Sequence, residues 1–355
     1  MADVTISTFD QFKDAIGNSD TVDVNYVLTQ DIDLNNDKYN WWTNDFITDS
    51  GSGKGTIDGG YTDSQGNLKR HIIANAYVYP TKHFFLDCFN CADNTMDTAR
   101  VAMKNLEFEI ILNNASFLWN SPKFGFKVST NIMFENCIFN IRAYNITNSY
   151  PIFYLAAARS YQRFIFKNCV FNLYLQTSAE NIINIFRNNS SDADKLYFEA
   201  CIFKIRNATK KFISMSNSGQ DCEITYDNCA VFYNDIGQGP AYSSMLCNSM
   251  GAILYDGHSR LRIINCYFSS FGPAPTARPR FSVAYGTDTT DSAIQNISNS
   301  FFDVNKLDCC IFRNSGNDVI SITNPESIKC AALTTAQCKD PNKLNEIGYI
   351  FSSEV

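Results

Sequence analysis

Charged side chains recur at one position of a repeated segment, and acid–base chemistry is the first use to consider for them. That position holds in turn Lys104, Glu135, Lys167, Glu199 and Asp227. A lysine beside a carboxylate supplies a base and an acid, and two carboxyl groups about 5 to 9.5 Å apart can cleave a glycosidic bond. Alternating charges also hold neighbouring strands in register, because opposite charges one strand apart attract. We predict this structural role and no catalytic residue, with a lysine–glutamate catalytic pair as the alternative.

Cysteine, histidine and aspartate are the residues that could bind a metal ion. Cys88 and Cys91 form a C-x-x-C pair, but the chain has only three histidines. A lone pair of this kind is a weak signal for zinc or for redox chemistry. Asp87, Asp93 and Asp97 surround the pair without the residue order of a calcium-binding loop. The sequence therefore predicts no metal site and no cofactor, and a structural role for the two cysteines.

An aromatic and acidic segment near the N-terminus is the candidate for binding a carbohydrate. It contains Trp41 and Trp42 in succession, with Tyr39 and Asp45 beside them. Aromatic rings stack on sugar rings, and carboxylates accept hydrogen bonds from sugar hydroxyls. Adjacent tryptophans in the first turn of a fold also pack into a core. Carbohydrate contact and core packing therefore both remain as interpretations.

Composition limits the classes of protein to consider. The 355 residues are 45% hydrophobic and 14% aromatic, which excludes a mainly disordered chain. No apolar run approaches the ~18 residues that span a bilayer, and the first residues lack the pattern of a signal peptide. A net charge of -7 argues against a nucleic-acid surface, and 13 cysteines without a secretion signal favour free thiols. We expect a soluble protein with no membrane insertion and no nucleic-acid partner.

A repeated motif organises the middle of the chain. Its clear copies carry alternating apolar residues, then an asparagine or alanine, then a cysteine, and degenerate copies flank them at 104–110 and 298–304. The clear copies are Met133–Ile141, Ile165–Leu173, Tyr197–Ile205, Thr225–Cys229 and Arg262–Phe268. They recur about every 30 residues with variable spacing, which is typical of a solenoid whose loops differ in length.

Within each copy the alternation of apolar residues shifts by one position at the asparagine. In the second copy Phe164 and Phe166 face one side, Asn168 follows, and Cys169 and Phe171 face that side again. Alternation predicts strands, and the shift predicts a sharp bend between two strands, because Asn tolerates a left-handed backbone. One copy cannot bury its apolar face alone, so successive copies must stack.

Stacking predicts columns of like residues along the axis of the solenoid. Amides of successive asparagines can hydrogen-bond across one strand spacing of about 4.8 Å, and cysteines serve as small buried hydrophobic residues. The asparagine stack comprises Asn105, Asn136, Asn168, Asn228, Asn265 and Asn299, with a gap at Ala200. The cysteine stack comprises Cys137, Cys169, Cys201, Cys229 and Cys266, which we expect to be free thiols.

Two further columns are apolar although the alternation places them on the outer surface. The first comprises Met133, Ile165 and Tyr197, and the second comprises Ile138, Val170, Ile202 and Tyr267. An apolar stripe on the outside of a solenoid needs cover. The cover is either the loops of the same chain or another protein chain, and in the second case these residues form a protein interface.

Paired strands around an inward asparagine, with aromatic and aliphatic stacks, resemble the single-stranded right-handed parallel β-helix of the pectate-lyase-like superfamily. The resemblance implies an all-β fold, a right-handed parallel β-helix solenoid with an N-terminal capping helix and a short C-terminal cap. We expect the capping helix within 1–20, the β-helix over 21–325 and the C-terminal cap or tail over 326–355. The helix signal is the capping-box spacing of Thr8 and Gln11, followed by apolar residues at helical intervals.

The resemblance extends to the β-helix proteins of phage tailspikes, and it implies a function. We expect a non-catalytic structural or binding protein, most simply a bacteriophage virion component such as a tail or capsid appendage. Such a protein is made in the host cytoplasm and located in the virion. The implied partners are other virion proteins or its own protomers, in a homotrimer like those of related β-helix proteins, and polysaccharide of the host surface.

Two other functions fit the same fold. Polysaccharide lyases and glycoside hydrolases of the tailspike depolymerase type use it, and they need acidic pairs beside a groove, here between the loops at 39–50 and 272–291. A bacterial adhesin on the cell surface is the third interpretation. Turnover of a polysaccharide distinguishes the enzyme from the two binding proteins.

Overall fold

Strands account for nearly all regular structure in the computed structural model of the chain. In the described part of the chain helix is confined to one short element, which confirms the predicted all-β class. The described residues are 2–16, 24–32, 55–62, 68–78, 85–86, 101–113, 117–120, 130–144, 152–157, 162–176, 181–187, 194–206, 211–217, 222–234, 260–269, 280–284, 297–298, 301–303, 308–313, 319–320 and 331–333.

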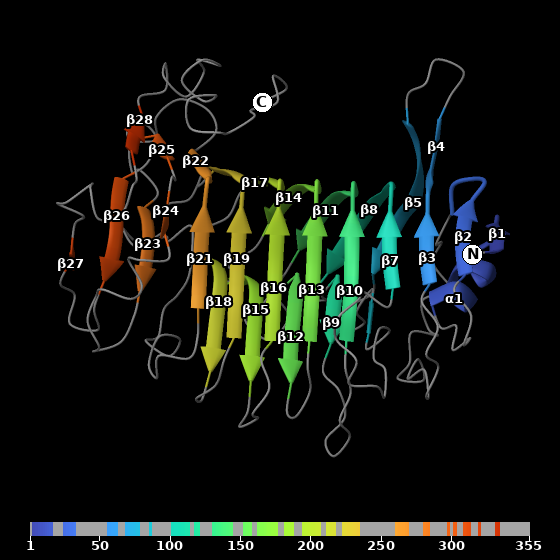
Figure 1. Cartoon of the computed structure of the whole chain (residues 1–355), viewed down its shortest axis with the longest axis horizontal. Coiled ribbons are helices and arrows are strands. Elements are labelled where there is room, and N and C mark those ends of the chain that lie inside the picture. The colour runs from blue at the N-terminus through green and yellow to red at the C-terminus, as the bar shows by residue number, and fades with distance from the viewer. Residues whose placement is uncertain are drawn as a thin grey trace.

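The first sheet has ten strands, and each of them pairs in parallel with its neighbours. Figure 1 shows most of these strands as a row of arrows along the long axis of the molecule. In order across the sheet they are β1 (Ala2–Ile6), β2 (Val24–Leu28), β3 (Gly55–Asp58), β7 (Val101–Lys104), β10 (Thr130–Glu135), β13 (Gln162–Lys167), β16 (Asp194–Glu199), β19 (Cys222–Asp227), β21 (Arg260–Ile264) and β24 (Ile297–Ser298).

The second sheet also has ten strands, and all of its pairs are parallel except that of β4 with β5. In order across the sheet they are β4 (Gly60–Thr62), β5 (Leu68–Val78), β8 (Leu106–Asn113), β11 (Ile138–Tyr144), β14 (Val170–Gln176), β17 (Ile202–Arg206), β20 (Ala230–Asn234), β22 (Tyr267–Ser269), β25 (Phe301–Asp303) and β28 (Ala331–Leu333).

Two smaller sheets complete the fold. The third sheet is parallel, and the fourth combines one parallel and one antiparallel pair. The third comprises β6 (Phe85–Leu86), β9 (Leu118–Asn120), β12 (Phe153–Ala157), β15 (Asn181–Arg187) and β18 (Lys211–Asn217). The fourth comprises β23 (Arg280–Ala284), β26 (Asp308–Arg313) and β27 (Val319–Ile320).

The chain visits the three larger sheets in a fixed order. From β7 onward it runs from the first sheet to the second and then to the third, and it completes this circuit four times before β19. We call one such circuit a turn. Each strand pairs with the equivalent strand one turn away, so that Phe134 lies opposite Phe166 and Phe139 opposite Phe171. This stacking of parallel strands is compatible with a parallel β-helix.

A sharp bend joins the first sheet to the second in each turn. The residue at the bend has a φ between 52° and 55° in six successive turns, which confirms the left-handed backbone predicted for the asparagines. Ala200 adopts the same conformation although it tolerates it less well than Asn. Backbone pairing continues through the bend, because Asn136 N donates to Lys167 O at 2.8 Å and Val170 N donates to Cys137 O at 2.9 Å.

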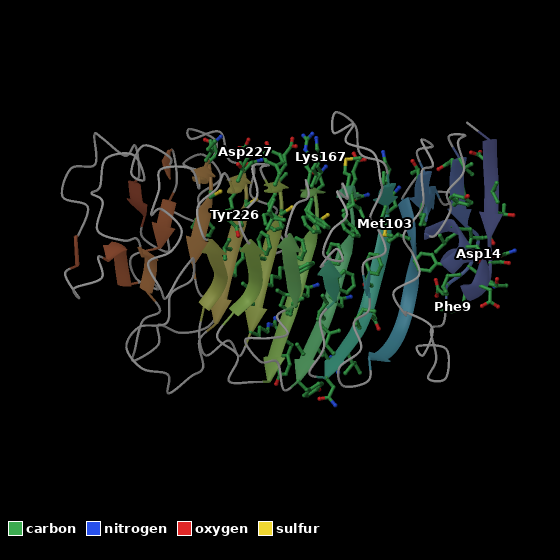
Figure 2. All side chains as sticks on the ribbon, turned by 90° about the horizontal axis from the view of Figure 1, so that it is seen from below. Phe9, Asp14, Met103, Lys167, Tyr226 and Asp227 are labelled. Carbon is green, nitrogen blue, oxygen red and sulfur yellow. The ribbon has the colours of Figure 1, made fainter. Side chains whose placement is uncertain are left out.

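The interior contains two columns of stacked aromatic rings. In the second sheet Phe108, Phe139, Phe171 and Phe203 stack with centroid distances of 5.2, 4.8 and 4.6 Å. In the first sheet Phe134, Phe166, Phe198 and Tyr226 stack at 5.1, 5.1 and 5.0 Å. The columns meet edge to face, and all these side chains are at most 1% exposed. Figure 2 shows Tyr226 inside the stack, with Lys167 and Asp227 at its outer side.

Helix α1 (Phe9–Ile16) lies next to β1 and β2 at the N-terminal end of the row of strands (Figure 1). Its start is the predicted capping box, since Gln11 N donates to Thr8 Oγ1 at 3.2 Å and Thr8 N donates to Gln11 Oε1 at 3.1 Å. Phe9, Phe12 and Ala15 are buried, so one face of the helix packs against the protein.

Candidate functional site

A groove lies on the outer face of the second sheet. It has a volume of about 690 Å³ and crosses β8, β11, β14 and β17. Two columns of outward side chains line it, each column advancing by one strand per turn. The first column is Glu109, Asn140, Asn172 and Lys204, and the second is Ile111, Arg142, Tyr174 and Arg206.

Side-chain amides form a ladder along the first column of the groove. Asn172 Nδ2 donates to Asn140 Oδ1 at 2.7 Å, and Asn140 Nδ2 donates to Glu107 Oε1 at 2.8 Å. Each amide is thereby fixed in orientation, and Asn172 Oδ1 accepts no hydrogen bond from the described residues. The groove therefore presents an oriented amide acceptor on a rigid strand, which is the type of group that binds a hydroxyl ligand.

Positive charge and an exposed ring distinguish the second column of the groove. Arg142 and Arg206 are exposed, and Tyr174 between them is 41% exposed. Arg142, Tyr174 and the neighbouring Lys204 have no hydrogen-bond or ion-pair partner among the described residues. Glu109 supplies the one carboxylate among the described lining residues. A basic surface of this kind stands out in a chain whose net charge is -7.

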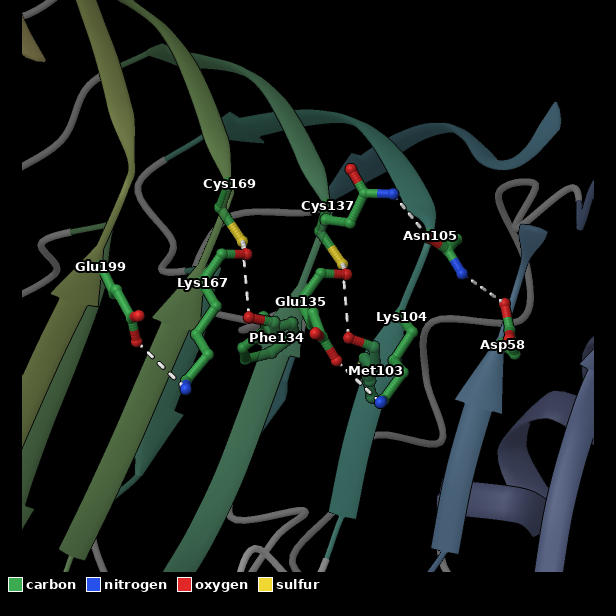
Figure 3. Close-up of polar contacts among 11 residues, drawn as sticks. Asp58, Met103, Lys104, Asn105, Phe134, Glu135, Cys137, Lys167, Cys169 and Glu199 are labelled. Atoms are coloured by element: carbon green, nitrogen blue, oxygen red, sulfur yellow. Dashed lines mark hydrogen bonds and ion pairs between the residues drawn. The ribbon is translucent and has the colours of Figure 1, made fainter. Parts of the chain in front are cut away.

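The outer face of the first sheet is charged in a different way. Lys104 Nζ lies 2.7 Å from Glu135 Oε2, and Lys167 Nζ lies 3.0 Å from Glu199 Oε2, as Figure 3 shows. The four residues lie in register on consecutive strands. Each lysine thus has a carboxylate partner in the next turn, which is the arrangement that the structural interpretation of this column predicted.

The column of charges ends in two neighbouring carboxylates. Asp227 lies opposite Glu199, and Tyr197 Oη donates to Asp227 Oδ2 at 3.4 Å. Burial and the negative charge of Glu199 raise the pKa of Asp227, although its hydrogen bonds with Tyr197 and Asn265 oppose the change. Burial and the two carboxylates raise the pKa of Tyr197 to about 12, so its hydroxyl stays protonated and donates.

The asparagines at the bend form a second amide ladder. Asn136 Nδ2 donates to Asn105 Oδ1 at 2.6 Å, and Asn105 Nδ2 donates to Asp58 Oδ1 at 2.8 Å (Figure 3). Ala200 interrupts this ladder. Beyond the gap Asn265 bonds to Asp227 instead, and the buried Asn228 Oδ1 has no hydrogen-bond partner in the described part of the chain. Asn168 is exposed at its bend, and Asn299 lies outside the described residues.

The cysteines line the interior directly after the bend. All five are free and fully buried: Cys137, Cys169, Cys201, Cys229 and Cys266. Each Sγ lies 3.2–3.5 Å from two backbone carbonyl oxygens, one of them in the preceding turn. Burial raises the pKa of the Cys137, Cys201 and Cys266 thiols, so these residues act as protonated packing groups.

The outer apolar columns lie in the predicted register but are partly covered. Met133 pairs with Ile165 and Ile165 with Tyr197, and Ala230 lies between Ile202 and Tyr267 in the other column. Ile165 is 8% and Tyr267 is 4% exposed, whereas the rest of both predicted sets is half-buried. Because the structure contains one chain, this chain itself covers Ile165 and Tyr267. The other members of the two columns are only half-buried, and a protein interface formed by them stays a prediction.

Several predicted site residues lie outside the described part of the chain. They are Trp41, Trp42, Tyr39 and Asp45 of the proposed carbohydrate site, the pair Cys88 and Cys91, and the aspartates Asp87, Asp93 and Asp97. Most of the loops at 39–50 and 272–291 and the C-terminal cap within 326–355 lie there as well. Among the described residues no group of three or more His, Cys, Asp or Glu is placed to hold a metal ion.

The groove residues had a signal in the sequence that the apolar and aromatic patterns obscured. Arg142, Tyr174 and Arg206 each come five residues after the cysteine of their motif.

Comparisons with protein-family models, with curated proteins and with solved structures found no match. No helix in the described segments has the length and hydropathy to cross a bilayer. The geometry of the groove therefore carries the functional proposal.

Proposed function

We propose that this chain is a non-catalytic binding protein that holds a polysaccharide in the groove of the second sheet. The single observation that carries the proposal is the combination, within one groove, of an oriented amide ladder and the exposed ring of Tyr174. Amides bind sugar hydroxyls, and an exposed ring stacks on the apolar face of a sugar. With one carboxylate among the described lining residues, binding suits this surface better than the two-carboxylate cleavage of a glycoside.

The scaffold that we propose is a right-handed parallel β-helix of the pectate-lyase-like type. Its support is the fixed order of sheets along the chain, the left-handed bend in six turns and the stacked interior columns. Helix α1 is proposed to cap the N-terminal end, since its buried Phe9 and Phe12 cover apolar surface beside β1 and β2. The domain limits and the C-terminal cap over 326–355 stay predictions.

A bacteriophage virion, as a tail or capsid appendage, is the setting that we propose for this binding protein. The proposal comes from the resemblance of the repeats to phage tailspike β-helices, and contact with host-surface polysaccharide fits the groove. Mass spectrometry of purified virus particles from the source of the protein tests it. Presence of the chain in the particle supports the virion setting, and its recovery from bacterial cell surfaces instead supports an adhesin.

Binding to immobilised polysaccharides tests the function itself. We expect the intact chain to bind at least one member of a panel of neutral and anionic polysaccharides, and Tyr174→Ala to weaken that binding about tenfold, or ~1.4 kcal/mol. The matched control is Tyr197→Ala, which removes a ring from the outer face of the first sheet and leaves the groove intact. Equal loss in both variants, or no binding at all, contradicts the proposal. Sustained release of reducing ends or of unsaturated sugars contradicts its non-catalytic part.

A further inference from the structure

The charges of the groove say more about the ligand than the amides do. Three cations, Arg142 on β11 and Lys204 and Arg206 on β17, lie within a span of three consecutive strands of one face, in a chain with a net charge of -7. A neutral glycan gives no reason for this concentration, because amides and a ring are sufficient to hold it. Like charges held together repel one another, and an anionic ligand converts that repulsion into attraction.

The charges are also regularly spaced. Arg142, Tyr174 and Arg206 occupy the same register position on β11, β14 and β17. Their Cα atoms are therefore one strand spacing apart in turn, and the two arginines are two spacings apart, about 9.6 Å. That separation is close to the length of a disaccharide in an extended chain. A polysaccharide lying across the strands thus places one ring over Tyr174 and an acidic group at each arginine.

From this geometry we infer that the groove takes a linear anionic polysaccharide with a carboxylate on alternate sugars, one carboxylate at Arg142 and the next at Arg206. The inference rests on the proposed function and names its class of ligand. Guanidinium groups bind carboxylates in two parallel hydrogen bonds, which gives the site its preference over hydroxyl groups. Lys204 adds positive charge beside the second position.

The same face argues against a nucleic acid as the occupant. Glu109 lines the groove at its first strand, and Glu107 lies two residues before it on the same face of β8. These carboxylates repel a phosphate backbone, which carries a charge at every nucleotide, whereas carboxylates on alternate sugars, at Arg142 and Arg206, leave a neutral sugar at the strand of Glu109. Of the two tyrosines that line the groove, Tyr174 is exposed and Tyr144 is half-buried, whereas single-stranded nucleic acids bind on successive exposed aromatic platforms.

The test compares a carboxylated polymer with its own neutral form. Hyaluronan carries a carboxylate on alternate sugars, and chemical reduction converts these groups to alcohols. Calorimetry measures the affinity for each polymer at an ionic strength of ~0.15 M. The further probes are alginate, polygalacturonate, a sulfated polymer, neutral dextran and an oligothymidylate. We expect a carboxylated polymer to bind at least tenfold more tightly than its reduced form, and added salt to weaken it.

Charge-removal variants locate the effect. The double variant Arg142→Gln/Arg206→Gln should lose at least tenfold in affinity for the carboxylated polymer and little for its reduced form. The control Arg163→Gln/Lys195→Gln removes the same charge from register partners in the first sheet, and should bind normally. Thermal melts establish that both variants fold, which is expected because Arg142 and Arg206 are exposed.

Each outcome separates the inference from the proposed function. Equal affinity for the carboxylated and reduced polymers, or binding of neutral polymers alone, overturns the inference and leaves polysaccharide binding intact. Preference for the sulfated polymer over every carboxylated one overturns the carboxylate assignment. Tighter binding of the oligothymidylate overturns it in favour of a nucleic acid. Failure to bind any polysaccharide overturns the proposed function itself.

Discussion

The inner and outer faces of the second sheet follow opposite rules, although they belong to the same strands. The inner face repeats one residue type in four consecutive turns, Phe108, Phe139, Phe171 and Phe203. One position further along, the outer face changes in every turn but one, through Glu109, Asn140, Asn172 and Lys204. An inner side chain packs against its own copies in the turns before and after it. An outer side chain meets solvent or a ligand.

This difference assigns stability to one face and binding to the other. The centroids of neighbouring phenylalanine rings are 4.6–5.2 Å apart, so a substitution of one ring alters the packing of both of its neighbours. The outer residues of the groove are exposed or half-buried, and surface changes of this kind typically alter stability by no more than ~0.5 kcal/mol. Substitutions on the two faces should therefore have separable effects.

Phe171→Ala gives the largest effect that we predict. Its ring is fully buried between Phe139 and Phe203, and truncation of such a ring costs about 3–5 kcal/mol through lost burial and the cavity left behind. Denaturant unfolding measures the loss, and the affinity of the molecules that remain folded should be unchanged. Tyr174→Ala, on the outer face of the same strand, is the control, with nearly normal stability and weakened binding. A loss in Phe171→Ala below ~1 kcal/mol contradicts this division between the two faces.

Ala200→Asn should stabilise the protein by about 1 kcal/mol. Asn tolerates the φ of 53° better than Ala, and its amide would stand between the asparagines of the neighbouring bends, Asn168 and Asn228, where it can donate to one and accept from the other. Ala200→Gly relieves the backbone alone and adds entropy to the unfolded chain, so we expect a smaller change. The reverse substitution Asn136→Ala removes the bond to Asn105 and should destabilise by a similar amount. If Ala200→Asn and Ala200→Gly melt at the same temperature, the amide ladder contributes nothing at this bend.

Much of this fold follows from one motif because the motif is local. The shift in alternation at Asn136 or Asn168 lies within nine residues, so the bend, the facing of the strands and the stacking could all be predicted. The third sheet could not, because β12, β15 and β18 lack the motif and become strands by pairing with the turns on either side. Strand β1 escaped prediction for the same reason, since its partner β2 lies about 20 residues further on.

The groove could be predicted from the sequence in part. The spacing from the cysteines fixes which residues share a column, so that Arg142, Tyr174 and Arg206 could be placed on one face from the sequence. Their common role could not be predicted, because the concavity of the face depends on the path of the chain in three dimensions. A density of aromatic residues pointed instead to Trp41 and Trp42, and that site stays a prediction.

On the outer face of the first sheet, a carboxylate with an ion-pair partner can be compared with a carboxylate that faces a like charge. Glu135 has Lys104 as an ion-pair partner, whereas Asp227 faces the like charge of Glu199. Burial and that charge raise the pKa of folded Asp227 above its unfolded value of about 3.9. Below that value Asp227 is protonated in both states. As the pH rises through the folded pKa, ionisation destabilises the folded state.

Asp227→Asn should therefore raise the melting temperature slightly at pH 7, by an amount equivalent to about 0.5 kcal/mol or less, and the gain should disappear near pH 3. The amide keeps an oxygen to accept from Tyr197, but its nitrogen replaces the second carboxylate oxygen, so the bond with Asn265 changes together with the charge. Glu135→Gln is the matched control and should have the opposite sign at pH 7, because it removes a favourable pair. Melting temperatures of both variants, measured across pH, test these two expected changes in stability. A stabilising effect of both, or of neither, would mean that the order of charges along this face is immaterial to its stability.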